Sequence, residues 1–171
     1  MIETFQRIYG ELGEEGFIDA ICPELPELYT ALHAISYQDG EAKNTCRKWL
    51  QAEKINLNLL KQYGIYARIE DVNTASHVVK YLTDMFIESG DFQRIMWMID
   101  EFQRIATMPF KKRNEALHAL QHTFDICSEG LTIFLSFSVT DPENMTAILT
   151  PEIKSRSRNS VPIEIVVFND S

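Results

Sequence analysis

Two adjacent carboxylates follow a short apolar run near the middle of the sequence. Residues 94–99 read Arg-Ile-Met-Trp-Met-Ile, and Asp100 and Glu101 come directly after them. The run predicts a strand covered on both faces. A carboxylate at the carboxyl end of a strand can hold Mg²⁺ while its neighbour orients a water molecule. The alternative is a helix N-terminus, where carboxylates stabilise unpaired backbone N–H groups.

Polar side chains also end a second apolar run, and two arginines lie in a basic stretch further along the chain. Residues 131–138 (LTIFLSFS) predict a second buried strand, which carries Ser136 and Ser138 near its end. Arg156 and Arg158 lie in the basic stretch 154–158. The serines are either ordinary strand residues or part of a site, and the arginines are either solvated loop charges or ligands of a phosphate.

Histidine and cysteine offer weaker chemistry. His118 and His122 lie four residues apart on an expected helix, but no glutamate completes an H-E-x-x-H motif and no third ligand is evident. We therefore expect no metal site there. The three cysteines, Cys22, Cys46 and Cys127, are too widely spaced for a metal clip or a disulfide framework, so we expect reduced, buried thiols.

The first half of the chain must position these groups with helices. Apolar residues at helical spacing predict helices over 2–12, from Pro26 through Ile35, over 41–53, over 56–63 and over 71–89. The first pattern stops at the glycines of residues 13–16. Gly64 and Gly90 follow two of the other helices, at positions where a positive φ is easily adopted.

The second half alternates strands and helices. The strand at 94–99 is followed by a helix over 111–127, the strand at 131–138, a brief helix from Asp141 and a third strand at 163–168. Strands joined by helices normally form a parallel sheet, and ligands then bind at the carboxyl ends of the strands. We therefore predict an α/β chain: a helical portion over 1–90 and an α/β portion over 91–171 with a three-stranded, mainly parallel sheet, packed as one compact unit.

Two segments resemble motifs of a known family. RIMWMIDEFQRI resembles the Walker B strand of P-loop ATPases of the AAA+ and STAND type, in which apolar residues precede Asp-Glu. About thirty residues later, LTIFLSFS resembles their sensor-1 strand. RKWLQAEKINLNLLKQYGI and the helix before Arg94 also resemble the helical insert of some prokaryotic members, so the resemblance covers most of the chain.

The resemblance implies a role for each candidate residue. Asp100 would help to coordinate Mg²⁺, and Glu101 would polarise the attacking water. Ser138, or less favourably Ser136, would sense the γ-phosphate. Arg156 or Arg158 falls where the family often places an arginine near the nucleotide. Mg²⁺ and ATP would be the cofactors of the complete ATPase.

The phosphate-binding loop of that family is missing from the sequence. No G-x-x-x-x-G-K-[ST] occurs, and none of the seven glycines precedes a lysine. The loop supplies most of the groups that hold a nucleotide, so we expect this chain not to bind or hydrolyse ATP efficiently by itself. We interpret it as a fragment or a truncated relative of an ATPase. Loss of the strand that leads into this loop would favour self-association, because strand edges stay unpaired.

Charge and hydropathy limit the other possibilities. The net charge is -9 and the pI is near 4.9, which argues against direct nucleic-acid binding. An acidic, non-enzymatic interaction or immunity-type protein that blocks a basic partner is the alternative function. No apolar run approaches the roughly 18 to 20 residues that span a bilayer, and a secretory signal pattern is absent, so we expect a cytoplasmic protein that does not bind membranes.

Overall fold

The computed structural model of the chain describes residues 1–127 and 129–138. The helix expected from Asp141, the strand expected at 163–168, and Arg156 and Arg158 lie outside these residues. The described elements, in chain order, are α1 (Ile2–Ile21), α2 (Pro26–Tyr37), α3 (Gly40–Leu50), α4 (Leu57–Gln62), α5 (Val72–Glu88), β1 (Ile95–Ile99), the 3-10 helix η1 (Phe102–Thr107), α6 (Phe110–Ile126) and β2 (Leu131–Leu135).

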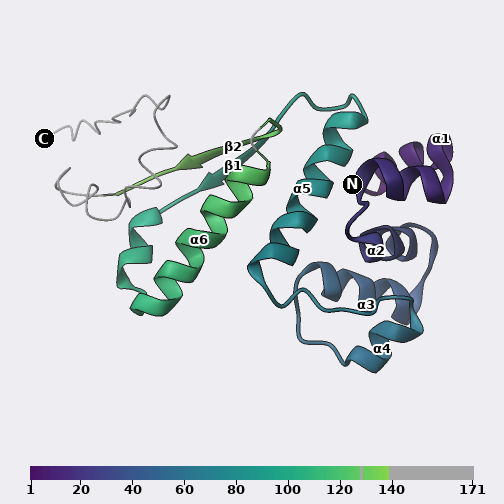
Figure 1. Cartoon of the computed structure of the whole chain (residues 1–171), viewed down its shortest axis with the longest axis horizontal. Helices are drawn as coiled ribbons and strands as arrows, with labels where there is room; N and C mark the ends of the chain where they lie inside the picture. The colour runs from purple at the N-terminus through teal and green to yellow at the C-terminus, as the bar shows by residue number, and fades with distance from the viewer. Residues whose placement is uncertain (128, 139–171) are drawn as a thin grey trace, which may run out of the picture.

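The chain is mostly helical, and α5 occupies the centre of the described part. Helices α1 to α4 lie on one side of α5, while α6 and the strands lie on the other (Figure 1). The larger core fills the space among the first five helices. The face of α2 that packs into this core is apolar, and its buried residues include Leu28, Ala31, Leu32 and Ile35.

Helix α1 continues beyond the point where the sequence pattern stops. The backbone leaves helical geometry at Gly13, with φ 70° and ψ -172°, and then resumes it as far as Ile21. Gly13 therefore ends the first helical segment, as the sequence predicted, and the part that the sequence pattern missed is the second segment, which runs to Ile21. Phe17 explains the continuation, because its buried ring packs edge-on against Phe5 at a centroid distance of 5.0 Å. Glycine at the kink allows the positive φ at little cost.

Helix α5 begins at a well-formed cap. Asp71 accepts a hydrogen bond from the backbone N–H of Thr74 (2.9 Å) and another from its hydroxyl (2.7 Å). These bonds satisfy one of the unpaired N–H groups of the first turn. The backbone turns away after the helix through Gly90, which has a φ of 73°. The helix predicted over 71–89 is thus confirmed nearly to the residue.

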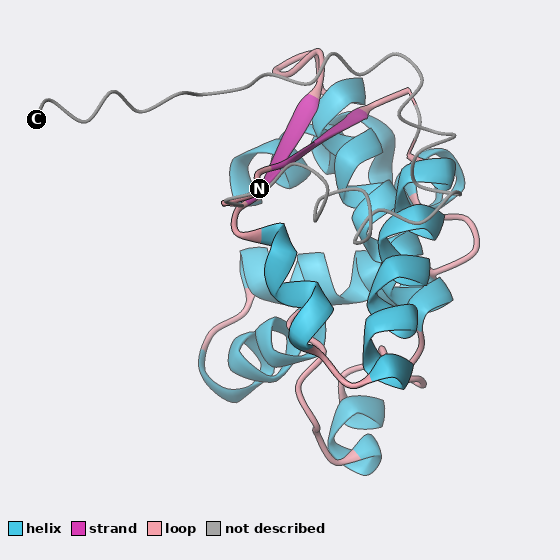
Figure 2. Cartoon of the chain, turned by 90° about the vertical axis from the view of Figure 1, so that its left-hand side faces the viewer, coloured by secondary structure: helices cyan, strands magenta, loops and turns pink. Residues whose placement is uncertain are grey.

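Strands β1 and β2 form a parallel pair, as the sequence predicted. Ile95 is paired with Leu131, and the register continues to Ile99 opposite Leu135. The described residues contain two strands, and the third expected strand falls outside them. Figures 1 and 2 show both strands at one edge of the molecule, with η1 and α6 connecting them.

Only one face of β1 is covered by the described residues, which corrects the prediction of a strand buried on both faces. Ile95, Trp97 and Ile99 are partly buried, whereas Met96 and Met98 are 58% and 80% exposed. On the covered side, Ile99 and Leu135 pack against a small cluster built from η1 and α6. The apolar run was interpreted as two-sided because methionine counts as apolar, although its thioether also tolerates an exposed position.

Two close contacts join α5 to the α/β portion. The hydroxyls of Ser76 in α5 and Thr123 in α6 share a buried hydrogen bond of 2.9 Å. Gly130, just before β2, lies so close to α5 that a Cβ there would stand 2.5 Å from Ile87 Cδ1 and 2.9 Å from Thr83 Cγ2. The absence of a side chain at residue 130 therefore lets the start of β2 lie against α5.

Candidate functional site

The carboxyl ends of the two strands bring Asp100 and Ser136 together. Asp100 follows the last residue of β1, and Ser136 follows the last residue of β2. Because Ile99 is paired with Leu135, the residues that follow them on the two strands, Asp100 and Ser136, are also neighbours. The Ser136 hydroxyl donates a hydrogen bond to Oδ1 of Asp100. The Ser136 backbone N–H donates to the carbonyl of Ile99 (3.0 Å), which extends the pairing beyond the strands.

Asp100 is held in its ionised form. The hydrogen bond from the Ser136 hydroxyl, followed by one from the backbone N–H of Glu101 (2.8 Å), lowers the pKa of the Asp100 carboxyl below its ordinary value. Both of these bonds end on Oδ1, and none from a described residue ends on Oδ2. The side chain is exposed. Asp100 therefore presents a solvent-accessible carboxylate at the edge of the sheet.

Glu101 adopts the left-handed backbone conformation, with φ 51° and ψ 40°. Its backbone N–H is held by Asp100 and lies 3.3 Å from Ser136 Oγ, while its carboxylate forms an ion pair with Arg104. A glutamate in this region is strained, and such residues are concentrated at functional sites. The strain is maintained here because the backbone N–H of the following residue, Phe102, also donates to the carbonyl of Ser136 (2.9 Å).

The alternative role for the acids, as caps of a helix, receives limited support. The helix that follows is η1, a 3-10 helix of six residues, and no side chain caps its first turn. Asp100 accepts from Glu101, which precedes that helix, rather than from an N–H group within it. Asp100 thus connects the two strand ends, whereas the Glu101 carboxylate pairs with Arg104 in η1.

The other residues predicted for the site are not seen in contact with Asp100 in the described part of the chain. The backbone N–H of Ser138 donates to Oε1 of Gln103 in η1 (3.1 Å), so Ser136 rather than Ser138 contacts Asp100. Arg156 and Arg158 lie outside the described residues. Arg104 was missed by the sequence reasoning, although its spacing of three residues from Glu101 on a helical turn was a usable signal.

The oxygen atoms at the strand ends could supply part of the coordination shell of Mg²⁺. Mg²⁺ is usually bound through one or two carboxylates, with water and phosphate completing its shell. Asp100 supplies an ionised carboxylate, and Ser136 supplies a neighbouring hydroxyl. Within the described ranges, no three His, Cys, Asp or Glu side chains gather as a metal-binding group. Any Mg²⁺ at Asp100 would therefore depend on water or phosphate oxygens as well.

His118 and His122 contact neighbouring side chains, and the three cysteines are buried. The rings of His118 and His122 stack 6.3 Å apart, and His122 Nε2 lies 3.0 Å from Oδ1 of Asn73. The predicted buried thiols are confirmed: Cys22, Cys46 and Cys127 are free and buried. Burial raises the pKa of each thiol to about 11, which leaves little of the reactive thiolate at neutral pH.

Comparison with known proteins identifies no family. No family model matches the sequence, and no curated protein or solved structure matches it. The search for membrane spans found no helix in residues 1–127 and 129–138 with the length and apolar character to cross a bilayer. The geometry of the strand ends is therefore the main indication of function in this chain.

Proposed function

We propose that the chain carries the Walker B and sensor-1 strands of a P-loop ATPase. In this proposal Asp100 is a ligand of Mg²⁺, Glu101 orients the attacking water, and Ser136 links the two strand ends, with Ser138 a further candidate to sense the γ-phosphate. The observation that carries the proposal is the hydrogen bond between Asp100 and Ser136 across the carboxyl ends of two parallel strands. Open α/β sheets bind their ligands at this edge.

The charges at the strand ends support the same chemistry. Mg²⁺ neutralises negative charge on a nucleotide phosphate, and it prefers an ionised carboxylate such as that of Asp100. Glu101 projects from a strained backbone position beside it, where a base that orients water would have to be held. Arg104 forms an ion pair with Glu101 and would help to fix the position of its carboxylate.

The missing phosphate-binding loop limits what this chain does alone. Without a G-x-x-x-x-G-K-[ST] sequence, backbone N–H groups and a lysine for the phosphates are lacking. Adding Mg·ATP should therefore leave the melting temperature of the 171-residue chain unchanged in a thermal shift assay. A clear, concentration-dependent rise would contradict this part of the proposal.

Turnover in an extended protein tests the proposal directly. The product of the longest open reading frame that contains this chain is expressed, and its ATP hydrolysis is measured. We expect Mg²⁺-dependent turnover that Glu101→Gln lowers by about two orders of magnitude or more, as loss of a general base does. Glu88→Gln, which changes an exposed acid at the end of α5, is the matched control and should leave the rate unchanged. The proposal fails if the extended protein has no turnover, or if Glu101→Gln retains the normal rate.

A second candidate function is favoured by the distribution of charge. Between residues 8 and 42 the sequence contains eight acidic side chains and no lysine or arginine. This part of α1 to α3 would suit an interaction protein that binds a basic partner through charge complementarity. The two candidates differ in their dependence on Glu101, since Glu101→Gln would leave such an acidic surface nearly intact.

A further inference from the structure

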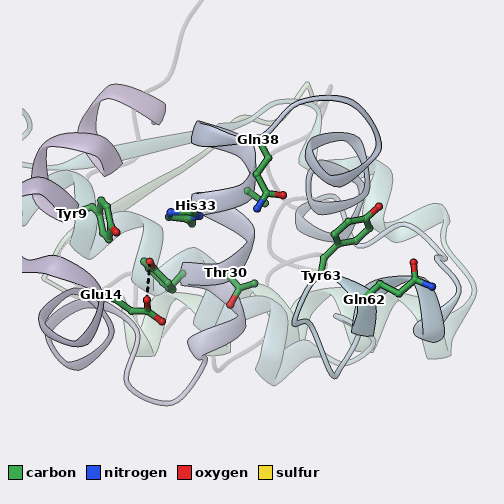
Figure 3. A pocket seen from close by; sticks show the side chains of 9 residues that line it. Tyr9, Glu14, Thr30, His33, Gln38, Gln62 and Tyr63 are labelled. Carbon is green, nitrogen blue, oxygen red and sulfur yellow. Dashed lines mark hydrogen bonds between the residues drawn. The ribbon is translucent and has the colours of Figure 1, made fainter.

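A cavity of about 390 Å³ opens between α1, α2 and the end of α4. Figure 3 shows Tyr9 and Glu14 on one side of it, His33 and Thr30 along α2, and Tyr63 on the opposite side. Its volume falls within the range of pockets that bind small molecules. The cavity lies in the helical part of the chain and shares no residue with the strand ends.

Aromatic rings form one wall of the cavity. The ring centroids of Tyr9 and Tyr29 lie 5.9 Å apart, and that of His33 lies 5.6 Å from Tyr9 and 5.7 Å from Tyr29. Tyr9 is held from behind by Phe5, whose ring stacks on it at 5.7 Å and 7°. The wall is therefore a packed aromatic cluster, and its ring faces carry partial negative charge.

The carboxylate of Glu14 supplies full negative charge beside these rings. Oε2 of Glu14 lies 3.4 Å from the hydroxyl of Tyr29, and this contact is visible in Figure 3. Burial, followed by its contacts with Tyr9 and Glu14, raises the pKa of the Tyr29 hydroxyl. At the other side, burial and then Glu41 raise the pKa of Tyr63. The residues that line the cavity include no lysine and no arginine.

We propose that this cavity binds a small organic cation of the alkylammonium class, with its charge against the rings of Tyr9, Tyr29 and His33 and near the carboxylate of Glu14. Aromatic faces attract a weakly hydrated cation, which loses little on leaving water. They are poor ligands for a metal ion, which needs several oxygen donors, and Glu14 is the single carboxylate in the lining.

The cation could be a free metabolite or the modified side chain of a partner protein, since both present the same ammonium group. Choline represents the first source, and the amide of N-acetyl-trimethyllysine represents the second. The uncharged isostere of choline, 3,3-dimethyl-1-butanol, has the same shape and tests whether charge is recognised. Binding of each probe to the 171-residue chain is measured by NMR chemical-shift changes of the Tyr9 and His33 signals.

We expect at least one of the cationic probes to bind at least tenfold more tightly than the neutral isostere. The tighter of the two identifies the source. Glu14→Gln should weaken binding about three- to tenfold, because it removes the carboxylate without removing the rings. Glu15→Gln is the matched control, since Glu15 is the adjacent exposed acid and does not line the cavity.

Three results would overturn the proposal. They are the absence of binding by both cations, equal binding of the isostere, and equal effects of Glu14→Gln and Glu15→Gln. Both substitutions change exposed side chains, so the folded state should be retained. Tyr9→Leu provides a second variant, which keeps an apolar residue in the wall but removes the ring, and it should abolish the preference for a cation over the isostere.

Discussion

The buried hydrogen bond between Ser76 and Thr123 should couple the two parts of the chain in unfolding. Ser76 is 2% exposed and Thr123 is 6% exposed, and their hydroxyl oxygens lie 2.9 Å apart. Replacing one partner leaves the other hydroxyl buried without it, which costs about 1–3 kcal/mol. We therefore expect Ser76→Ala and Thr123→Val each to lower the free energy of unfolding by about that amount.

The double variant distinguishes the hydrogen bond from simple loss of packing. Once both hydroxyls are gone, neither is left unsatisfied, so the double variant should be more stable than the sum of the single effects predicts. The expected difference is at least about 1 kcal/mol. A difference below about 0.3 kcal/mol would mean that the two hydroxyls do not interact, and the reasoning would be refuted.

Tryptophan fluorescence during urea unfolding provides the measurement. The sequence contains two tryptophans, Trp49 in α3 and Trp97 in β1. In a Trp97→Phe background the signal comes from Trp49, which is buried and far along the chain from α6. If α5 couples the two parts, Thr123→Val must lower the urea midpoint reported by Trp49. An unchanged midpoint, with a shifted transition in far-UV circular dichroism, would show that the parts unfold independently.

Three further predictions concern single positions. Asp71→Ala should lower the free energy of unfolding by about 0.5–2 kcal/mol, because the cap on Thr74 is lost; Asp71→Asn should restore most of it in the same urea assay. Glu101→Gly should stabilise the chain by about 0.5–1 kcal/mol by relieving the left-handed strain, and destabilisation instead would contradict the backbone assignment. Ser136→Ala should raise the pKa of Asp100 toward its ordinary value, measured from carboxyl ¹³C shifts. Because the pKa of Asp100 is lower in the folded state, its ionised form stabilises the fold at pH values above the unfolded-state pKa of about 4. This stabilisation is lost as the pH falls through the folded-state pKa. Ser136→Ala should therefore lose less stability in acid than the unmodified chain does.

Patterns within a short stretch of sequence predicted the helices and the strand type well. Helix α5 followed from the spacing of its apolar residues between Asp71 and Gly90, and both ends have local causes. The parallel pairing of the strands followed from the helix between them. The second segment of α1, after the kink at Gly13, was not predicted, since the burial of Phe17 against Phe5 is a tertiary contact that no local pattern displays.

The candidate site was predicted in its location but not in its detail. The acids at the end of β1 were visible in the sequence because they interrupt an apolar run. The partner of Asp100 depends on the register between the strands, which makes Ser136 its neighbour while Ser138 extends toward Gln103. The aromatic cavity could not be predicted, because Tyr9, Glu14 and Tyr63 come from separate helices and meet only through packing.

The three buried cysteines can serve as probes of local opening in this chain. Cys22 and Cys46 lie in the core among the first five helices, and Cys127 lies at the end of α6. A thiol reagent can modify each of them only while the surrounding structure is transiently open. The rates of modification at Cys22 and Cys127 would therefore report, residue by residue, whether the helical core or the sheet-bearing end opens more often under native conditions.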